Sequence, residues 1–151
     1  MFNLFRKKEK KNPIIAEIIE LSELSKKIYN DIEIVLESVK EKRFSFTLDV
    51  SRSNYNFAYN LNSKLKSLDY KLKEIKANNE VLKDLEVHKY KTYLLMECLK
   101  DIIEFSPFEI ENFEYFYYLL LSGRDILSDL MVFLNNLFNY LNNLCNQTSN
   151  L

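Results

Sequence analysis

Carboxylates gather in one stretch of the sequence, and they are the residues best suited to do chemistry. They are Glu97, Asp101, Glu104, Glu111 and Glu114. Glu104 and Glu111 fall on either side of a predicted helix connection, where oxygen ligands can hold a divalent cation. The sequence therefore offers one catalytic hypothesis, a metal-dependent hydrolase that uses the carboxylates from Glu97 to Glu114.

Other catalytic arrangements lack the partners that they need. His88 is the one histidine, and no glutamate precedes it by three residues, as a di-iron helical bundle requires. His88 also falls on an apolar stripe, which favours a packed core residue over a general base. Glu17 and Glu20 flank another apolar stripe and are expected to form a solvated acidic edge. We therefore expect no enzyme, no cofactor and no metal.

Glycine is nearly absent, since the 151 residues contain only Gly123. Phosphate-binding loops, nucleophile elbows and two-residue hairpin turns all use glycine, because it adopts positive φ without steric cost. The scarcity excludes the glycine-rich signatures. Residue types with AT-rich codons are abundant, so part of the scarcity is genomic.

Apolar residues spaced three and four apart predict four helices, near 14–42, 53–77, 80–105 and 107–146. The first stripe is Ile14, Ile18, Leu21, Ser25, Ile28, Ile32, Val35 and Val39. The second is Ala58, Leu61, Leu65, Leu68, Leu72 and Ile75. The third is Leu82, Leu85, His88, Thr92, Leu95, Leu99 and Ile102. The fourth is Ile110, Phe113, Tyr117, Leu120, Arg124, Leu127, Met131, Leu134, Phe138, Leu141 and Cys145. These stripes predict an all-α fold, an antiparallel bundle with coiled-coil-like seams.

Local signals set the expected ends of these helices. Asn12–Pro13 predicts the start of the first helix, and the capping box at 106–109 predicts the start of the last. The spacing loses register at 77–80, where we expect a tight turn; one continuous helix with a stammer is the alternative. Any break in the last helix is expected at 122–124, around Gly123.

The segment 43–51 changes to a period of two. Phe44, Phe46, Leu48 and Val50 alternate with polar residues, which predicts a short extended segment. Antiparallel pairing with the same segment of a second subunit would create favourable cross-strand pairs, so these four residues form a candidate interface. An extended linker whose aromatic residues cover the bundle is the alternative.

The last helix carries a second candidate interface. From Leu130 to Leu151 the sequence has no charged residue, and its polar positions include Asn135, Asn139 and Asn142. Amides without charge suit an interface, because charges are costly to remove from water. A solvated polar face is the alternative.

Residues 1–12 are expected to form a basic amphiphilic tail before a single domain at 13–146, with a second tail at 147–151. Phe2, Leu4 and Phe5 precede Arg6 and several lysines, so they can contact an anionic membrane surface or a partner. A disordered tail is the alternative. No apolar run reaches about 18 residues, so no membrane-spanning helix is predicted.

These features lead us to expect a non-enzymatic helical bundle that acts in protein–protein interaction or scaffolding and self-associates. Its partner would be a second copy or another helical protein. The lysines of 53–77 leave nucleic-acid binding as an alternative, although they simply occupy the polar side of an amphipathic helix. Cys98 and Cys145 lie on apolar stripes without metal-ligand spacing, which favours a reducing compartment, the cytoplasm.

Overall fold

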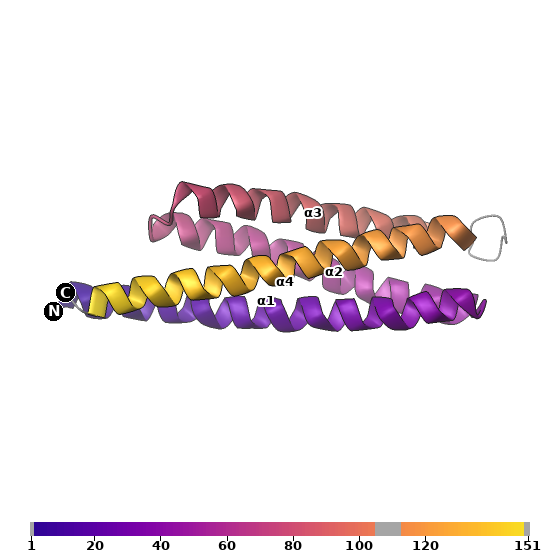
Figure 1. The fold of residues 1–151 in the computed structure, drawn as a ribbon, viewed down its shortest axis with the longest axis horizontal. Coiled ribbons are helices and arrows are strands. Elements are labelled where there is room, and N and C mark those ends of the chain that lie inside the picture. The colour runs from indigo at the N-terminus through magenta and orange to yellow at the C-terminus, as the bar shows by residue number, and fades with distance from the viewer. Residues whose placement is uncertain (1, 105–112, 150–151) are drawn as a thin grey trace.

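Over its described residues, the computed structural model contains four α-helices, α1 (Phe2–Lys40), α2 (Phe44–Glu74), α3 (Asn79–Glu104) and α4 (Phe113–Ser149). It describes residues 2–104 and 113–149, and the side chains of residues 13–104 and 114–144. Figure 1 shows that each helix runs antiparallel to the next, and α4 packs against α1 to close the bundle. No strand occurs in these described ranges. The predicted all-α antiparallel bundle is confirmed.

The seam of α1 is buried along its whole predicted length. All eight residues of the stripe from Ile14 to Val39 are buried, including the polar interruption Ser25. The Ser25 hydroxyl donates a hydrogen bond of 2.7 Å to the Leu21 carbonyl one turn earlier. This bond satisfies the hydroxyl inside the core, so one serine does not interrupt the apolar seam.

The predicted helix start at Asn12–Pro13 is wrong, because α1 already begins at Phe2 and Pro13 lies inside it. Proline fixes a helical φ but has no N–H, so within a helix it removes one backbone hydrogen bond. The sequence Asn12–Pro13 is therefore compatible with the first turn of a helix. It is equally compatible with the interior of a helix that lacks one backbone hydrogen bond.

The predicted extended segment 43–51 is also wrong, because residues 44–51 form the first turns of α2. The buried residues here are Thr47, Ser51 and Asn54, which lead into Ala58 at steps of four, three and four. The buried positions at helical spacing are therefore occupied by polar side chains. The large apolar residues of the same segment alternate with polar ones, so the sequence pattern resembles that of a strand. Burial against the neighbouring helices outweighs the local strand-like pattern.

Lysine, and not glycine, makes the left-handed turn at the end of α1 and of α2. Lys42 has φ 59° and Lys76 has φ 56°. At the first turn, the Arg43 N–H donates to the Ser38 carbonyl at 2.8 Å; at the second, the Ala77 N–H donates to the Leu72 carbonyl at 3.0 Å. These are Schellman caps, which usually place glycine at the left-handed position. The turn predicted at 77–80 is confirmed, and one continuous helix there is excluded.

The helix α4 is continuous through Gly123, so no break occurs at 122–124. Its buried seam is Phe116, Leu120, Gly123, Leu127, Leu130, Leu134, Leu137 and Leu141. The prediction had four of these leucines but placed Arg124 in the seam where Gly123 lies. A Cβ on Gly123 would lie 2.9 Å from Leu95 Cδ1 and 3.4 Å from Ile32 Cδ1. Gly123 thus lets α4 approach both α1 and α3 closely.

The two termini of the bundle lie at the same end. Figure 1 shows the start of α1 and the end of α4 running together beyond the turn between α2 and α3. The Asn78 N–H donates to the Tyr140 hydroxyl at 3.1 Å, which marks the level of that turn on α4. The capping box predicted at 106–109 lies outside the described residues.

Candidate interaction surfaces

The first candidate interface, predicted as a strand, lies on the helical surface of α2. Phe46 is exposed, whereas Phe44, Leu48 and Val50 are half-buried. Thr47 points inward instead, where its hydroxyl lies 2.8 Å from that of Ser38 on α1. A helix presents these four apolar residues in different directions, so they do not form the flat pairing edge that self-association as a strand needs.

The second candidate interface, the amide face of α4, lies at the surface. Asn135 and Asn139 are exposed and Asn142 is half-buried. Val132 is the large hydrophobic residue exposed nearest to them along the helix. This face is accessible, but it offers little apolar area for a partner to bury.

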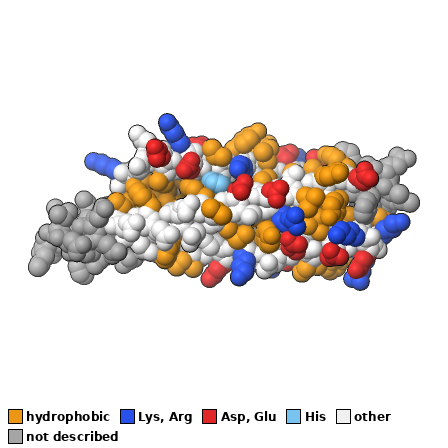
Figure 2. Space-filling model, in the orientation of Figure 1, with side chains coloured by type: hydrophobic (Ala, Val, Ile, Leu, Met, Phe, Trp, Pro, Cys, Tyr) orange, Lys and Arg blue, Asp and Glu red, His pale blue; other side chains and the backbone are white. Residues whose placement is uncertain are grey.

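A third surface, which the sequence interpretation missed, lies on the outer side of α3. Val87, Tyr90, Tyr93 and Leu94 are all exposed. In Figure 2, hydrophobic side chains gather along the upper edge of the molecule, where α3 lies in Figure 1. A second stripe at three- and four-residue spacing marks this face in the sequence, opposite the buried stripe through Leu95. A helix with two apolar stripes can bury one and expose the other.

Charged side chains join each pair of neighbouring helices. Glu17 and Glu20 of α1 pair with Lys71 at 2.6 Å and Lys64 at 3.4 Å on α2. The acidic edge predicted on α1 and the basic side of α2 therefore neutralise each other in part. Because a nucleic-acid footprint needs free cations, this pairing weakens the nucleic-acid hypothesis.

The same Glu and Lys residues border a shallow groove between α1 and α2, with a volume of about 530 Å³. Its lining also includes the exposed residues Pro13, Ala16, Ser63 and Ser67. The groove is polar and open, and its charges are already paired.

Two further ion pairs join α4 to its two neighbouring helices. Lys91 of α3 lies 3.3 Å from Asp129 of α4, and Arg124 of α4 lies 3.1 Å from Glu33 of α1. The hydrogen bond from Arg124 to Glu33 raises the pKa of the guanidinium. Arg124 thus lies at the edge of the seam, where it fixes α4 to α1.

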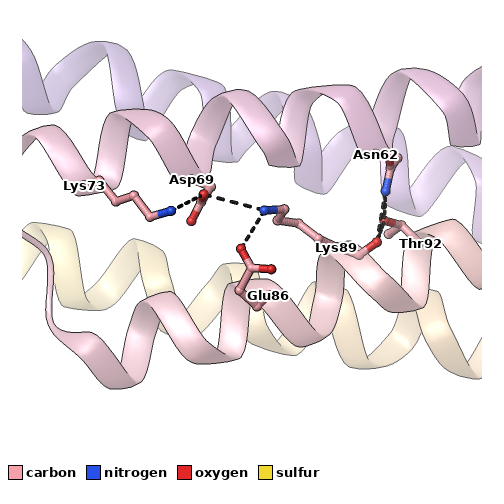
Figure 3. A network of polar contacts seen from close by, with 6 residues as sticks. All are labelled: Asn62, Asp69, Lys73, Glu86, Lys89 and Thr92. Carbon is pink, nitrogen blue, oxygen red and sulfur yellow. Dashed lines mark hydrogen bonds and ion pairs between the residues drawn. The ribbon is translucent and has the colours of Figure 1, made fainter.

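A polar network crosses the contact between α2 and α3, as Figure 3 shows. The buried Asp69 carboxylate lies 2.9 Å from Lys73 Nζ and 3.6 Å from Lys89 Nζ. Burial alone would lower the pKa of Lys89, but its hydrogen bond to Glu86 and the nearby Asp69 outweigh that effect and raise it. The Lys89 ammonium therefore stays charged between two carboxylates.

Two turns before Asp69 on α2, the Asn62 amide joins the two helices directly. It donates 2.9 Å hydrogen bonds to the Lys89 carbonyl and to the Thr92 hydroxyl. Such contacts form in only one alignment of α2 and α3, so the network fixes the register between them.

His88 of α3 faces α4. Its ring stacks on Phe133 with centroids 4.6 Å apart. Burial lowers the pKa of His88, and the nearby Lys91 lowers it further. The neutral ring behaves as a packing residue, as its place in the seam predicts.

The acidic residues near the connection of α3 and α4 are dispersed among other contacts. Glu104 lies 3.9 Å from Lys100, and Asp101 accepts a hydrogen bond of 3.3 Å from the Tyr115 hydroxyl. Burial raises the pKa of the Cys98 thiol, and Asp101 and Glu97 raise it further, so the thiol is a poor nucleophile at neutral pH. In the part of the chain that the structure describes, no three potential ligands form a metal cluster. Glu111 lies outside that part.

The predicted contact residues Phe2, Leu4 and Phe5 lie in the first turns of α1, and their side chains are outside the described set. Their contact with a membrane or a partner stays a prediction. Within the described residues, no helix is both long and apolar enough to cross a bilayer.

The fold and its surfaces define a four-helix bundle with an uncovered aromatic face on α3. Comparison of the chain with family models, with curated proteins and with solved structures finds no match.

Proposed function

We propose that this protein is a non-enzymatic helical bundle that acts in protein–protein interaction or scaffolding, and that it self-associates. The partner is a second copy of the chain or another helical protein. As part of this proposal we place the protein in the cytoplasm, because a reducing compartment keeps thiols such as that of Cys98 free.

The observation that carries the proposal is the outer face of α3. Val87, Tyr90, Tyr93 and Leu94 lie within two turns of one helix and remain exposed, although the core beneath them is well packed. Tyrosine and leucine on a helical face supply apolar area with little loss of side-chain entropy, which suits them to contacts with another helix. An apolar helical face of this kind typically marks an interaction site.

Sedimentation equilibrium between about 1 and 200 µM tests this proposal, combined with affinity capture of cellular proteins on the full chain. We expect the average mass to rise with concentration, or a specific helical partner to bind the chain. A strict monomer over this range that also captures no partner would contradict the proposal.

A further inference from the structure

The outer face of α3 carries a complete heptad stripe. Its members are Lys83, Val87, Tyr90, Leu94, Glu97 and Asp101. Their steps are four, three, four, three and four residues, so they line one side of the helix over about 27 Å. Lys83, Val87, Tyr90 and Leu94 are exposed, and Glu97 and Asp101 are half-exposed.

The stripe lies opposite the buried seam of α3. That seam, with Leu85, Leu95, Leu99 and Ile102, already packs inward, where α3 meets α2 and α4. No other described helix covers the outer side. The helix α3 therefore has a second stripe with coiled-coil spacing that no described helix of the same chain covers.

Charge is distributed unevenly along this second seam. Lys83 lies near the start of α3, the apolar residues lie in its middle, and Glu97 and Asp101 lie near its end. A parallel copy would place Lys83 against Lys83 and Asp101 against Asp101. An antiparallel copy would place each positive end against a negative end, so the charges favour a second copy in that orientation.

We propose that two copies of this chain form an antiparallel α3–α3 contact with a two-fold axis at the level of residue 92. In this register Tyr90 of one copy lies opposite Leu94 of the second copy, and Lys83 opposite Asp101 of the second copy. Val87 then packs beside the aliphatic part of Glu97 of the second copy. The pairing matches the knobs-into-holes layers of an antiparallel coiled coil.

Tyr93 extends the contact at the edge of the stripe. It is exposed and lies one residue from the level of the axis, so Tyr93 of the second copy lies at the same edge. Two tyrosines there add aromatic area near the centre of the contact, where binding energy concentrates. This inference rests on the self-association proposed above and adds its surface, its orientation and its register.

The first test is Tyr90→Glu, measured by sedimentation equilibrium of the full chain. The change places two carboxylates in the centre of the contact, and we expect the dissociation constant of the dimer to rise at least 100-fold. Tyr118→Glu on α4 is the matched control, since Tyr118 is 64% exposed and Tyr90 is 63% exposed. We expect the control to change dimerisation less than about twofold, and circular dichroism to show that both variants fold.

The second test is a charge exchange that reports on orientation. Lys83→Glu and Asp101→Lys should each raise the dissociation constant about tenfold, because each repels its counterpart twice in the dimer. The double variant restores opposite charges in the antiparallel register, so we expect it to return close to the original affinity. A double variant as weak as the single ones would overturn the register.

Failure of this inference and failure of the proposed function give different results. If the chain self-associates and Tyr90→Glu leaves its association unchanged, the α3 contact is overturned but self-association through another face stands. If the chain is monomeric and binds a helical partner, the α3 dimer and the proposed self-association are overturned, and only the interaction with another helical protein stands. A monomer without any partner overturns both.

Discussion

Helices α2 and α4 lie diagonally across the bundle, and they bury side chains of different chemistry. The described seam of α4 is apolar from Phe116 to Leu141, with Gly123 as its small position. The buried face of α2 includes Thr47, Ser51, Asn54, Asn62 and Asp69. Both helices contact α1 and α3, so the same two neighbours meet one apolar and one mixed surface.

The difference suggests separate roles for the two helices, one in the stability of the bundle and one in the alignment of its helices. Apolar burial on α4 contributes free energy of folding without fixing one alignment, because leucines at heptad spacing fit several registers. Thr47 and Asn62 of α2, which have partners on α1 and α3, contribute little net free energy but penalise alignments that break these contacts. On this view α4 stabilises the bundle and α2 determines how its helices align.

Some polar atoms of α2 have no partner among the described residues. These are Ser51 Oγ, Asn54 Oδ1 and Asp69 Oδ1. A buried polar atom without a hydrogen bond costs free energy. This cost on α2 sharpens the contrast with α4, whose described seam carries none.

The largest effect of a change in α4 is expected from Gly123→Leu. A Cβ alone would lie 2.9 Å from Leu95 Cδ1, so a full leucine must separate α4 from α1 and α3. We expect a loss of about 3 kcal/mol in the free energy of unfolding, measured by urea denaturation.

Gly123→Ala is the control for that variant. Its close contact is with the flexible end of Leu95, and removal of a helical glycine favours folding by about 1 kcal/mol, so the net change should stay within about 1 kcal/mol. If the leucine variant were as stable as the original chain, α4 would not be tightly packed at this position.

An intermediate effect is expected from Asn62→Leu in α2. Thr92 still donates to the Lys89 carbonyl at 2.9 Å after the amide is removed, so no strong acceptor is left without a donor. We expect the free energy of unfolding to change by less than about 1 kcal/mol, while amide signals in NMR spectra broaden as the register loosens.

The reciprocal variant Leu65→Asn tests the same comparison from the other side. Leu65 is fully buried one turn from Asn62, and an amide there meets apolar neighbours. We expect a loss of more than about 3 kcal/mol. Equal losses for the two variants would show that Asn62 stabilises the bundle directly.

The smallest effect concerns pH and His88, which joins α3 to α4. Because burial lowers its pKa in the folded state, the unfolded chain binds the proton more readily. Stability from the neutral ring is complete above the unfolded pKa of about 6.5 and decreases as the pH falls below it. We expect the stability difference between the original chain and His88→Gln to shrink from pH 7.5 to 5.5 in urea titrations. A difference that grows over this range would contradict a lowered pKa.

The sequence predicted the seams of α1, α2 and α3 well, because each carries large apolar residues at helical spacing over several turns. It failed at 44–51, where Thr47 and Ser51 occupy the seam and Phe44 and Phe46 imitate a strand. It also misplaced part of the α4 seam by one residue. Phe116 and Tyr117 are both aromatic, so the spacing of apolar residues does not show which of the two is buried. Only the neighbours of a helix decide which of two adjacent aromatic residues is buried.

The candidate surfaces were less predictable than the fold. The sequence pointed to residues 43–51 and to the amides of α4. Of these three surfaces, the outer face of α3 exposes the most aromatic side chains, Tyr90 and Tyr93. Exposure depends on which helices are neighbours. Helix α3 has two stripes at helical spacing, and the longer one, which is buried, dominates the sequence pattern.

By itself, the sequence determined the helical class of the fold and favoured an antiparallel bundle with a turn near 77–80, since the apolar periodicity loses register there; the structure excluded one continuous helix at that point. Only the tertiary structure decided the role of the single glycine. The sequence allowed a hinge at Gly123, whereas the packing places it against Ile32 and Leu95 inside an unbroken helix. The physical reason is that a missing side chain affects both backbone freedom and the distance between helices, and the latter depends on residues far away in the sequence.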